Sequence, residues 1–452
     1  MLKASSKRTR TLITLYIFLV SSSKFFIFPL APFPKSHMTR KTFLISMLGL
    51  IVQYYDHHLF GFLAPILAQH FMAASDPIVK LLDTYFILAI GYLAKPIGAL
   101  VLGRIGDLYG RSVTLTISLA GASIGSLIIS LIPGYSHIGA LSALILLIAR
   151  MSTCAVVSSG TDGVRLFIYE RIGKDKQCLG TGLAASSTLI GSFIASMSAL
   201  FFTLNIFPSY SWRFAFLLGS AMGVITIMIR RRYVIDKDES SELDPSYEEF
   251  KNEPTLSIIL KNWKLFILCL LVAGAIGSTN QFYIIFFGTY NFEILHTISR
   301  SVMQFYISIG IALYIIFAVI GGLTSDMLGR KFVGSLAFVV LLIITIATMF
   351  FLSRNESSPI LFFASLVTLP FFVIPALASV KQSIPKVIRY RMFSFAHAIG
   401  SICISAPTAL FSTLLYHETK VSWAPMCYFL ATILIIVIST NILYKKYGAD
   451  KY

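Results

Sequence analysis

Twelve apolar segments follow one another along this 452-residue chain after Thr42. Each is about 20 residues or longer, which is the length a helix needs to cross the hydrocarbon core of a bilayer. We therefore predict an all-α membrane protein with twelve transmembrane helices. The predicted spans lie at about 43–67, 82–103, 113–132, 139–166, 179–202, 212–230, 264–289, 303–324, 332–352, 359–380, 392–415 and 423–444.

Composition and charge exclude two other classes of protein. Hydrophobic residues make up 56% of the chain and charged residues 13%, against about 25% charged in soluble domains. The net charge of +17 does not indicate a nucleic-acid partner, because no soluble surface is available to carry a basic face. Of the 37 lysines and arginines, only four lie in predicted outer loops: Lys80, Arg300, Arg354 and Lys420. This bias predicts that both termini are cytoplasmic.

A ten-residue segment occurs twice in related form, at 103–112 and at 322–331. Four of its positions match at a spacing of 219 residues, which is close to half the length of the chain. The repeat predicts two related halves of six spans each, as in secondary transporters built from parallel repeats. The matched residues are Gly103 with Gly322, Asp107 with Asp326, Gly110 with Gly329, and Arg111 with Arg330.

Both copies lie between two spans on the predicted cytoplasmic side. Their glycines allow a tight turn and close helix contact. The aspartate and arginine of each copy are four residues apart and can pair if the turn is helical. The carboxylate can also face the positive N-terminal end of a neighbouring helix. We predict that these residues form a cytoplasmic gate, since a merely basic loop explains the arginines but not the matched spacing.

The two copies also carry a family resemblance. The first resembles the loop between spans two and three of the major facilitator superfamily, and the second resembles its counterpart in the C-terminal half. A finer resemblance is to the metabolite–proton symporters, which include bacterial proline/betaine transporters. It rests on Gly49–Gly61 in the first span, Lys95–Gly98 in the second, and Ser211–Phe216 at the start of the sixth. The resemblance covers nearly the whole chain after residue 38 and implies the major facilitator fold and proton-coupled symport of a small polar or zwitterionic metabolite, such as a betaine, proline or an organic acid.

The chain departs from that family pattern at two acidic positions. The family usually has Glu-Trp where this chain has Gln53 and Tyr54, and an expected glutamate in span four is replaced by Gly160. Arg150, at the start of the same span-four pattern, is present. Because two acids are missing, an uncoupled facilitator or exchanger of the same fold remains an alternative to symport.

The first span contributes most of the predicted transport path. Gln53 and Asp56 share one helical face, and Tyr54 and Tyr55 lie between them. An ionisable residue within a span is costly unless it pairs or lines a wet cavity. We predict Asp56 to be the coupling or substrate-binding acid, although it can instead be the structural partner of a lysine or arginine. His57 and His58 can relay protons or simply hydrogen-bond a neighbouring helix.

Polar residues in other spans complete the predicted path. Arg150 can neutralise Asp56 or bind a substrate carboxylate through two parallel hydrogen bonds. Alternatively, its side chain can extend to the membrane–water interface. Lys95, inside span two, can serve as an ion partner. Asp162 and Arg165 are three residues apart and can pair with each other. In span seven, aromatic rings suit amine ligands through cation–π contact but also serve for packing; the predicted site residues there are Asn280, Gln281 and Tyr283.

The domain boundaries follow from the spans. Residues 1–41 are interpreted as an N-terminal extension, either not native or signal-like, because Met38 followed by Thr39, Arg40 and Lys41 resembles a natural start. The predicted parts are a six-helix bundle at 42–230, a polar cytoplasmic linker at 231–262, a second six-helix bundle at 263–445 and a cytoplasmic tail at 446–452.

These observations together predict a monomeric secondary transporter in a bacterial inner membrane, working by alternating access, with a small-molecule substrate, protons and the lipid bilayer as partners. No cofactor or metal is expected, since the five cysteines have no metal-binding spacing. An enzyme would need a clustered nucleophile and base, which the sequence does not contain. A non-transporting membrane sensor of the same fold remains the other alternative.

Overall fold

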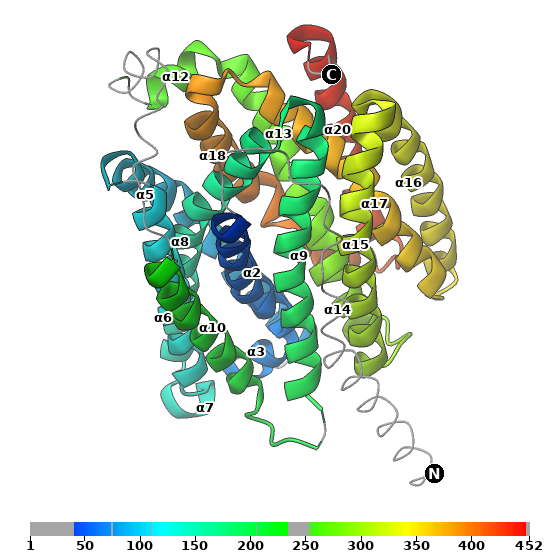
Figure 1. The fold of residues 1–452 in the computed structure, drawn as a ribbon. Coiled ribbons are helices and arrows are strands. Elements are labelled where there is room, and N and C mark those ends of the chain that lie inside the picture. Colours follow the sequence, from blue (N-terminus) through cyan, green and yellow to red (C-terminus); the bar gives the residue numbers. More distant parts are fainter. Residues whose placement is uncertain are drawn as a thin grey trace. The chain divides into compact units, whose positions relative to one another are not determined.

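The computed structural model describes residues 40–73, 76–109, 111–204, 206–233, 253 and 255–448. In these ranges the regular structure is entirely helical (Figure 1). Eleven segments are long and apolar enough to cross a membrane, and they coincide with the second to twelfth predicted spans, which confirms the predicted all-α membrane fold. The eleven are Ile78–Leu102, Thr114–Leu131, Leu141–Glu170, Lys174–Phe202, Trp212–Arg232, Trp263–Ile294, Arg300–Leu328, Arg330–Ser353, Pro359–Ser383, Arg389–Thr419 and Ala424–Tyr447.

Several of these segments are built from more than one helical element. The elements up to residue 233 are α2 (Arg40–Phe62), α3 (Ala64–Phe71), α4 (Pro77–Gly91), η1 (Tyr92–Ala94), α5 (Lys95–Tyr109), α6 (Arg111–Leu131), α7 (Tyr135–Ile138), α8 (Leu141–Arg171), η2 (Lys174–Lys176), α9 (Gln177–Phe202) and α10 (Trp212–Tyr233). Those that follow are α12 (Thr255–Lys261), α13 (Trp263–Asn280), η4 (Gln281–Phe286), α14 (Phe287–Thr289), η5 (Tyr290–Ile294), α15 (Arg300–Leu328), α16 (Arg330–Ser353), α17 (Pro359–Ser383), η6 (Lys386–Ile388), α18 (Arg389–Gly400), η7 (Ser401–Ser405), α19 (Thr408–Thr419) and α20 (Ala424–Tyr447).

The first predicted span is a helix but is not among the eleven apolar segments. α2 ends at Phe62, and α3 begins at Ala64 with Pro65 in its first turn. The middle of α2 carries Gln53, Asp56 and two histidines, which make it less apolar than the other spans. α2 packs against α9 and α10, so its polar face is enclosed by protein rather than by lipid.

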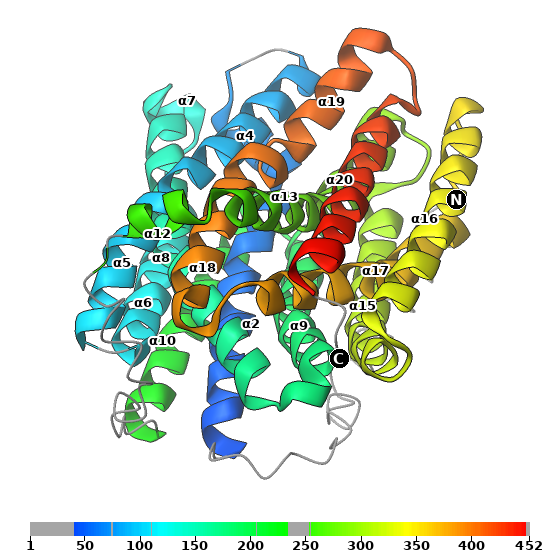
Figure 2. The ribbon, with the colours of Figure 1, turned by 90° about the horizontal axis from the view of Figure 1, so that it is seen from above.

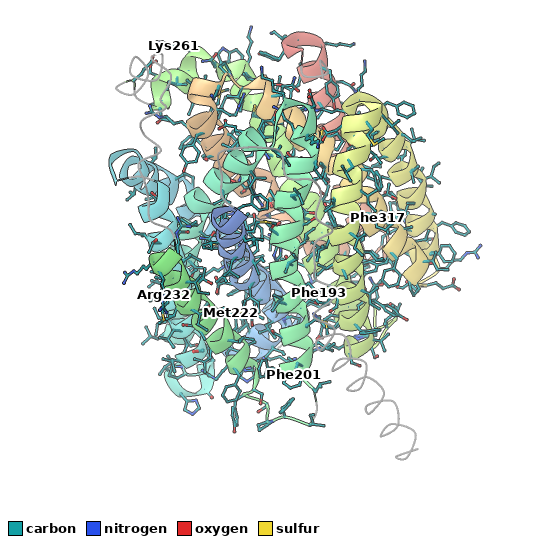
Figure 3. The ribbon with its side chains drawn as sticks, viewed as in Figure 1. Phe193, Phe201, Met222, Arg232, Lys261 and Phe317 are labelled. Carbon is teal, nitrogen blue, oxygen red and sulfur yellow. The ribbon has the colours of Figure 1, made fainter. Side chains whose placement is uncertain are left out.

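Large apolar side chains cover the outer surface of the helices. Figure 3 shows Phe193 of α9 and Phe317 of α15 among the side chains on the face turned to the viewer. On α16 the exposed apolar residues recur every three or four positions, as one stripe of a helix does. Such a surface requires lipid to cover it. The stripe consists of Phe332, Leu336, Val339, Ile343, Ile346 and Phe350.

α9 packs against both α2 and α15, which are far apart in the sequence (Figure 1). Small residues allow helices in a membrane to approach closely, and hydroxyl groups can then bond across the contact. The Ser186 hydroxyl donates to the Ile315 carbonyl oxygen over 2.9 Å, and the Ser196 and Ser308 hydroxyls lie 2.6 Å apart. A Cβ atom on Gly182 would lie 2.4 Å from the Ala318 carbonyl oxygen.

Figure 2 shows α5 and α6 on one side of the molecule and α16 on the opposite side. α5 and α6 pack against α8, while α16 packs against α17. The division into bundles at 42–230 and 263–445 stays a prediction, and residues 1–39, 234–252 and 449–452 of the predicted extension, linker and tail lie outside the described residues.

The close approach at Gly182 yields a first prediction. In Gly182→Ala the new methyl group meets the backbone of α15, which cannot rotate away, so we expect a loss of about 1–3 kcal/mol of stability. The measurement is the melting temperature of the purified, detergent-solubilised protein. Gly334→Ala is the matched control, because a Cβ there would meet only a Pro375 side-chain atom at 3.7 Å. Equal melting temperatures for the two variants would contradict this account of the α9–α15 contact.

Candidate transport site

A central cavity is lined by side chains from α2, η1, α5, α8, α9, α13, η4, α15, α17, α18 and η7. Its volume is about 130 Å³, counted as space that the centres of water molecules can occupy. Most of the wall is apolar, with a minority of polar groups, which is the usual composition of a small-molecule site. The ionisable groups on the wall are Tyr54, Asp56, His57, His58, Tyr92, Lys95, Cys154, Asp162, Arg165, Tyr314, Lys381 and His397.

Asp56 is buried in the wall of this cavity, with 4% of its surface exposed. Ser126 of α6 donates a hydrogen bond to its Oδ1 atom. Its Oδ2 atom has no hydrogen-bond partner among the described residues. Arg150 makes no ion pair with Asp56 in the described part of the chain, although the guanidinium still attracts the carboxylate through space. One carboxylate oxygen of Asp56 is therefore free to bind a proton or a ligand.

Arg150 contacts His57 instead. Its guanidinium lies 3.3 Å from His57 Nδ1 and donates to the His57 carbonyl oxygen at 3.3 Å. It also lies over the Phe60 ring, 4.9 Å from the centroid. Because arginine has no acceptor, Nδ1 of His57 accepts. The ring proton therefore sits on Nε2, which donates to the Tyr92 hydroxyl at 2.7 Å. Arg150 and Tyr92 thus fix the orientation of the imidazole.

A second cluster joins α8 to α18. Nδ1 of His397 lies 2.8 Å from Oδ2 and 3.0 Å from Oδ1 of Asp162, across 235 residues of sequence. Arg165 lies 3.4 Å from Asp162 Oδ1 and also donates to the Tyr54 hydroxyl. Asp162 has 1% of its surface exposed. Asp162 and Arg165 do pair, as the sequence suggested, but they do not pair only with each other.

The cavity wall carries two lysines at different positions. Lys95 Nζ lies 3.6 Å from the centroid of the Tyr92 ring. Lys381, near the end of α17, has none of its surface exposed and donates to the Thr181 hydroxyl at 3.3 Å. Cationic groups are thus present on both the α5 and the α17 sides of the cavity.

The structure brings five of the nine predicted path residues to the cavity wall. These five are Tyr54, Asp56, Lys95, Asn280 and Gln281. The other four are not among the residues that line the cavity, and they contact neighbouring side chains or backbone. Gln53 donates to Ser118 of α6 at 2.8 Å, Tyr55 donates to the Ala215 carbonyl oxygen at 2.7 Å, and Arg150 holds His57.

Tyr283, the last of these four, accepts a hydrogen bond from Ser365 and packs against the Phe429 ring. It sits in the π-helical turn η4, which alters the angular spacing of side chains. Counting residues at the spacing of an α-helix therefore gives the wrong direction for the Tyr283 side chain relative to Asn280 and Gln281.

His397 and Lys381 are functional candidates that sequence reasoning missed. The sequence does contain a reason to select them, because an ionisable residue in or beside an apolar span is a functional candidate by default. What the sequence does not contain is the contact with Asp162 or Thr181, since neither partner is near in the chain. The same holds for Tyr92 and its contacts with His57 and Gln281.

The second copy of the repeated segment contacts the first turn of α9. Asp326 accepts hydrogen bonds from the backbone N–H groups of Cys178 at 3.0 Å and Leu179 at 2.8 Å. This is the favourable position for a carboxylate at a helix N-terminus. Arg330 donates to Gln177 at 3.0 Å and to Gln382. We name this set of contacts between Asp326, Arg330 and the first turn of α9 the latch.

Asp326 and Arg330 do not pair with each other in the described structure, because the turn between them is not helical. α15 ends at Leu328 and α16 begins at Arg330, with Gly329 at φ 93° between them. Only glycine adopts that backbone conformation without strain. At Gly322 a Cβ atom would lie 2.6 Å from the Cys178 carbonyl oxygen, so this glycine permits the close approach of α9.

The side chains of the first copy lie outside the described residues, and so does Gly110 as a whole. The predicted gate roles of Gly103, Asp107, Gly110 and Arg111 therefore stay predictions. In the described part of the chain, no group of three or more His, Cys, Asp or Glu residues could hold a metal ion.

Comparison with known proteins agrees with this arrangement. The model of the Major Facilitator Superfamily matches residues 46–406. A putative proline/betaine transporter of Staphylococcus aureus is 26% identical over 88% of this chain and 86% of its own length. The citrate-proton symporter of Klebsiella pneumoniae is 26% identical over 85% of this chain and 89% of its own. Among solved structures, the D-xylose-proton symporter superposes with a TM-score of 0.66 at 15% identity, over 91% of this chain and 98% of its own.

The fold and the family match together define the class of the protein, which is an integral membrane transporter and not an enzyme. The chain belongs to the major facilitator superfamily.

The latch yields a second prediction. Asp326→Asn removes the charge that faces the N-terminus of α9, which is worth about 1 kcal/mol in a partly buried setting. We expect the buried Cys178 thiol to react about fivefold faster with maleimide in a variant where Cys178 is the only cysteine. The control is Asp175→Asn, which makes the same change at an exposed position in η2. An unchanged labelling rate in Asp326→Asn would show that Asp326 does not hold this contact.

Proposed function

We propose that this transporter carries a small polar metabolite into the cell together with protons, by alternating access between halves formed by residues 42–230 and 263–445. Both termini and the 231–262 linker are cytoplasmic, and the membrane is a bacterial inner membrane. The protein works as a monomer. The relatives named above include both a proline/betaine transporter and a proton symporter, which supports this class of substrate and coupling.

The single observation that carries the proposal is the contact between Asp162 and His397. Both are titratable, both line the cavity, and their helices α8 and α18 belong to different predicted halves. When the carboxylate is ionised, the imidazole N–H donates to it and holds the two helices together. A proton on the carboxylate removes the charge that makes this hydrogen bond strong. Proton binding therefore changes how tightly the two halves are joined.

In this proposal, Asp162 in its contact with His397 takes over the proton-binding role of the two carboxylates that the family pattern has and this chain lacks. The acidic family positions 53 and 160 are neutral here, whereas Asp162 lies only two residues beyond 160 in α8. Asp56 remains as a second buried acid on the cavity wall, with one oxygen available. The loss of the two acids therefore does not remove titratable carboxylates from the transport path.

The transport cycle follows from these contacts. With Asp162 ionised, its bond to His397 and the latch keep the cytoplasmic side closed while the substrate binds from outside. Protonation of Asp162 weakens the α8–α18 contact, and the cytoplasmic ends separate. Release of the proton and the substrate to the cytoplasm restores the strong hydrogen bond between Asp162 and His397 and closes that side again.

The latch and one ion pair add to the closure of the cytoplasmic side. Arg389, at the start of α18, lies 2.9 Å from Glu170 near the end of α8. Like Asp162 and His397, these residues come from the two predicted halves. Partly exposed pairs contribute only about 0–1 kcal/mol each, so the closed state depends on several weak contacts that can break together.

The proposal predicts that Asp162→Asn loses proton-driven accumulation. Protein in liposomes is tested with radiolabelled betaine, proline and dicarboxylates, with and without an imposed proton gradient. A charge-assisted hydrogen bond is worth about 1.5–3 kcal/mol, so we expect gradient-driven uptake to fall about tenfold or more, while substrate exchange at equal pH persists. His397→Gln is expected to behave in the same way.

The control for this experiment is Asp175→Asn, in which an exposed carboxylate outside the cavity is removed. Wild-type uptake that ignores collapse of the proton gradient would exclude symport and leave a facilitator or exchanger. Full proton-driven accumulation by Asp162→Asn would remove Asp162 from the coupling mechanism.

A further inference from the structure

Lys381 is a buried ammonium group whose partners carry no negative charge. Its surface is entirely inaccessible, and its Nζ atom donates to the Thr181 hydroxyl at 3.3 Å. The same hydroxyl donates its own hydrogen to the Gln177 carbonyl oxygen at 3.0 Å. The ammonium otherwise lies over two aromatic rings, at 5.2 Å from the Tyr169 centroid and 6.0 Å from that of Phe393.

These contacts do not replace the water that a lysine loses on burial. A lysine ammonium has three donors, and only one of them has an acceptor here. No carboxylate lies within ion-pair distance of Lys381 among the described residues. A buried charge of this kind is strongly unfavourable unless an opposite charge accompanies it. Lys381 lines the cavity, so a ligand in the cavity can supply that charge.

Neither carboxylate on the cavity wall forms an ion pair with Lys381 among the described residues. Asp162 is contacted by His397 and Arg165. Asp56 faces Arg150 through space. The wall carries three basic side chains, Lys95, Arg165 and Lys381, against two acidic ones, Asp56 and Asp162. Basic side chains therefore outnumber acidic ones on the wall, and Lys381 makes no ion pair with a carboxylate in the described part of the chain.

We infer that Lys381 binds a carboxylate of the transported molecule, with the Thr181 hydroxyl beside it, so that the substrate is a small organic anion. This inference rests on the proposed transport function and narrows its substrate class. A net-neutral zwitterion such as proline or a betaine would leave the excess of basic over acidic side chains on the wall in place, whereas an anion offsets it. The aromatic rings of Tyr169 and Phe393 form an apolar surround that excludes water from the ammonium and strengthens its attraction for an anion.

The test measures equilibrium binding to the purified full-length protein in lipid nanodiscs, with no gradient. The probes are radiolabelled succinate and citrate as anions, and proline and glycine betaine as zwitterions. We expect the wild-type protein to bind at least one of the anions and to bind it more tightly than either zwitterion. In Lys381→Met the affinity for that anion should fall about tenfold or more, because a charge-assisted hydrogen bond is lost.

Two further variants separate ligand binding from a structural role. Lys381→Arg keeps the positive charge and should recover most of the anion affinity that Lys381→Met loses. Lys386→Met removes an exposed lysine five residues away and should leave affinity unchanged. Each variant is compared after its melting curve shows that it is folded.

The inference is overturned if folded wild-type protein binds neither anion, if it binds a zwitterion more tightly than both anions, or if folded Lys381→Met keeps wild-type anion affinity. Each of these results leaves proton coupling untouched, because binding is measured without a gradient. Conversely, anion binding that depends on Lys381 combined with uptake that ignores protons would overturn symport alone.

Discussion

Charge inside a membrane protein must be compensated, because moving an ion from water to the hydrocarbon region costs several kcal/mol unless partners replace the lost water. The cavity of this transporter is organised around that requirement. Asp162 is contacted by His397 and Arg165, and Arg150 is contacted by His57 and the Phe60 ring. The contacts with His397 and with His57 join one helix to another, so these partners of the buried charges also decide which helices lie together around the cavity.

The latch, the Tyr169 side chain and the Lys381 side chain all make contacts at the beginning of α9. Gln177 accepts from Arg330 of the latch and, at 2.7 Å, from the Tyr169 hydroxyl. The Tyr169 ring lies under the Lys381 ammonium, and Thr181, one turn after Gln177, accepts from it. The latch and the proposed anion site therefore both contact Gln177. An anion that draws Lys381 away from Thr181 and Tyr169 alters the same turn that the latch holds.

The sequence predicted the architecture far better than the site. Span length and apolar composition depend only on local residues, so eleven spans agree with prediction, and the exception, α2, is the helix whose polar residues line or support the site. Asp56 and Lys95 were predicted to be in the path because charges within spans are rare. The role of Tyr283 could not be predicted, since it depends on a π-helical turn that shifts the register.

Partners distant in the chain were also beyond sequence reasoning. The repeated segment identified Asp326 as a gate residue, and a helix N-terminus was one of its two predicted partners, but nothing in the sequence designates α9 as that helix. Asp56 and Arg150 make no ion pair among the described residues, because Arg150 finds closer acceptors on His57. Residue type and spacing indicate that a group needs a partner; only the packing of helices decides which partner it has.

The central claim is that the protonation state of the Asp162–His397 pair controls the contact between the two halves. It is tested most directly by pulsed electron paramagnetic resonance on spin labels at Lys174 and Lys386, which are exposed positions on η2 and η6, in protein without native cysteines. The account predicts that the distance between the labels lengthens when the pH is lowered, and that this change disappears in the Asp162→Asn, His397→Gln double variant. The same pH-dependent lengthening in the double variant would contradict the account.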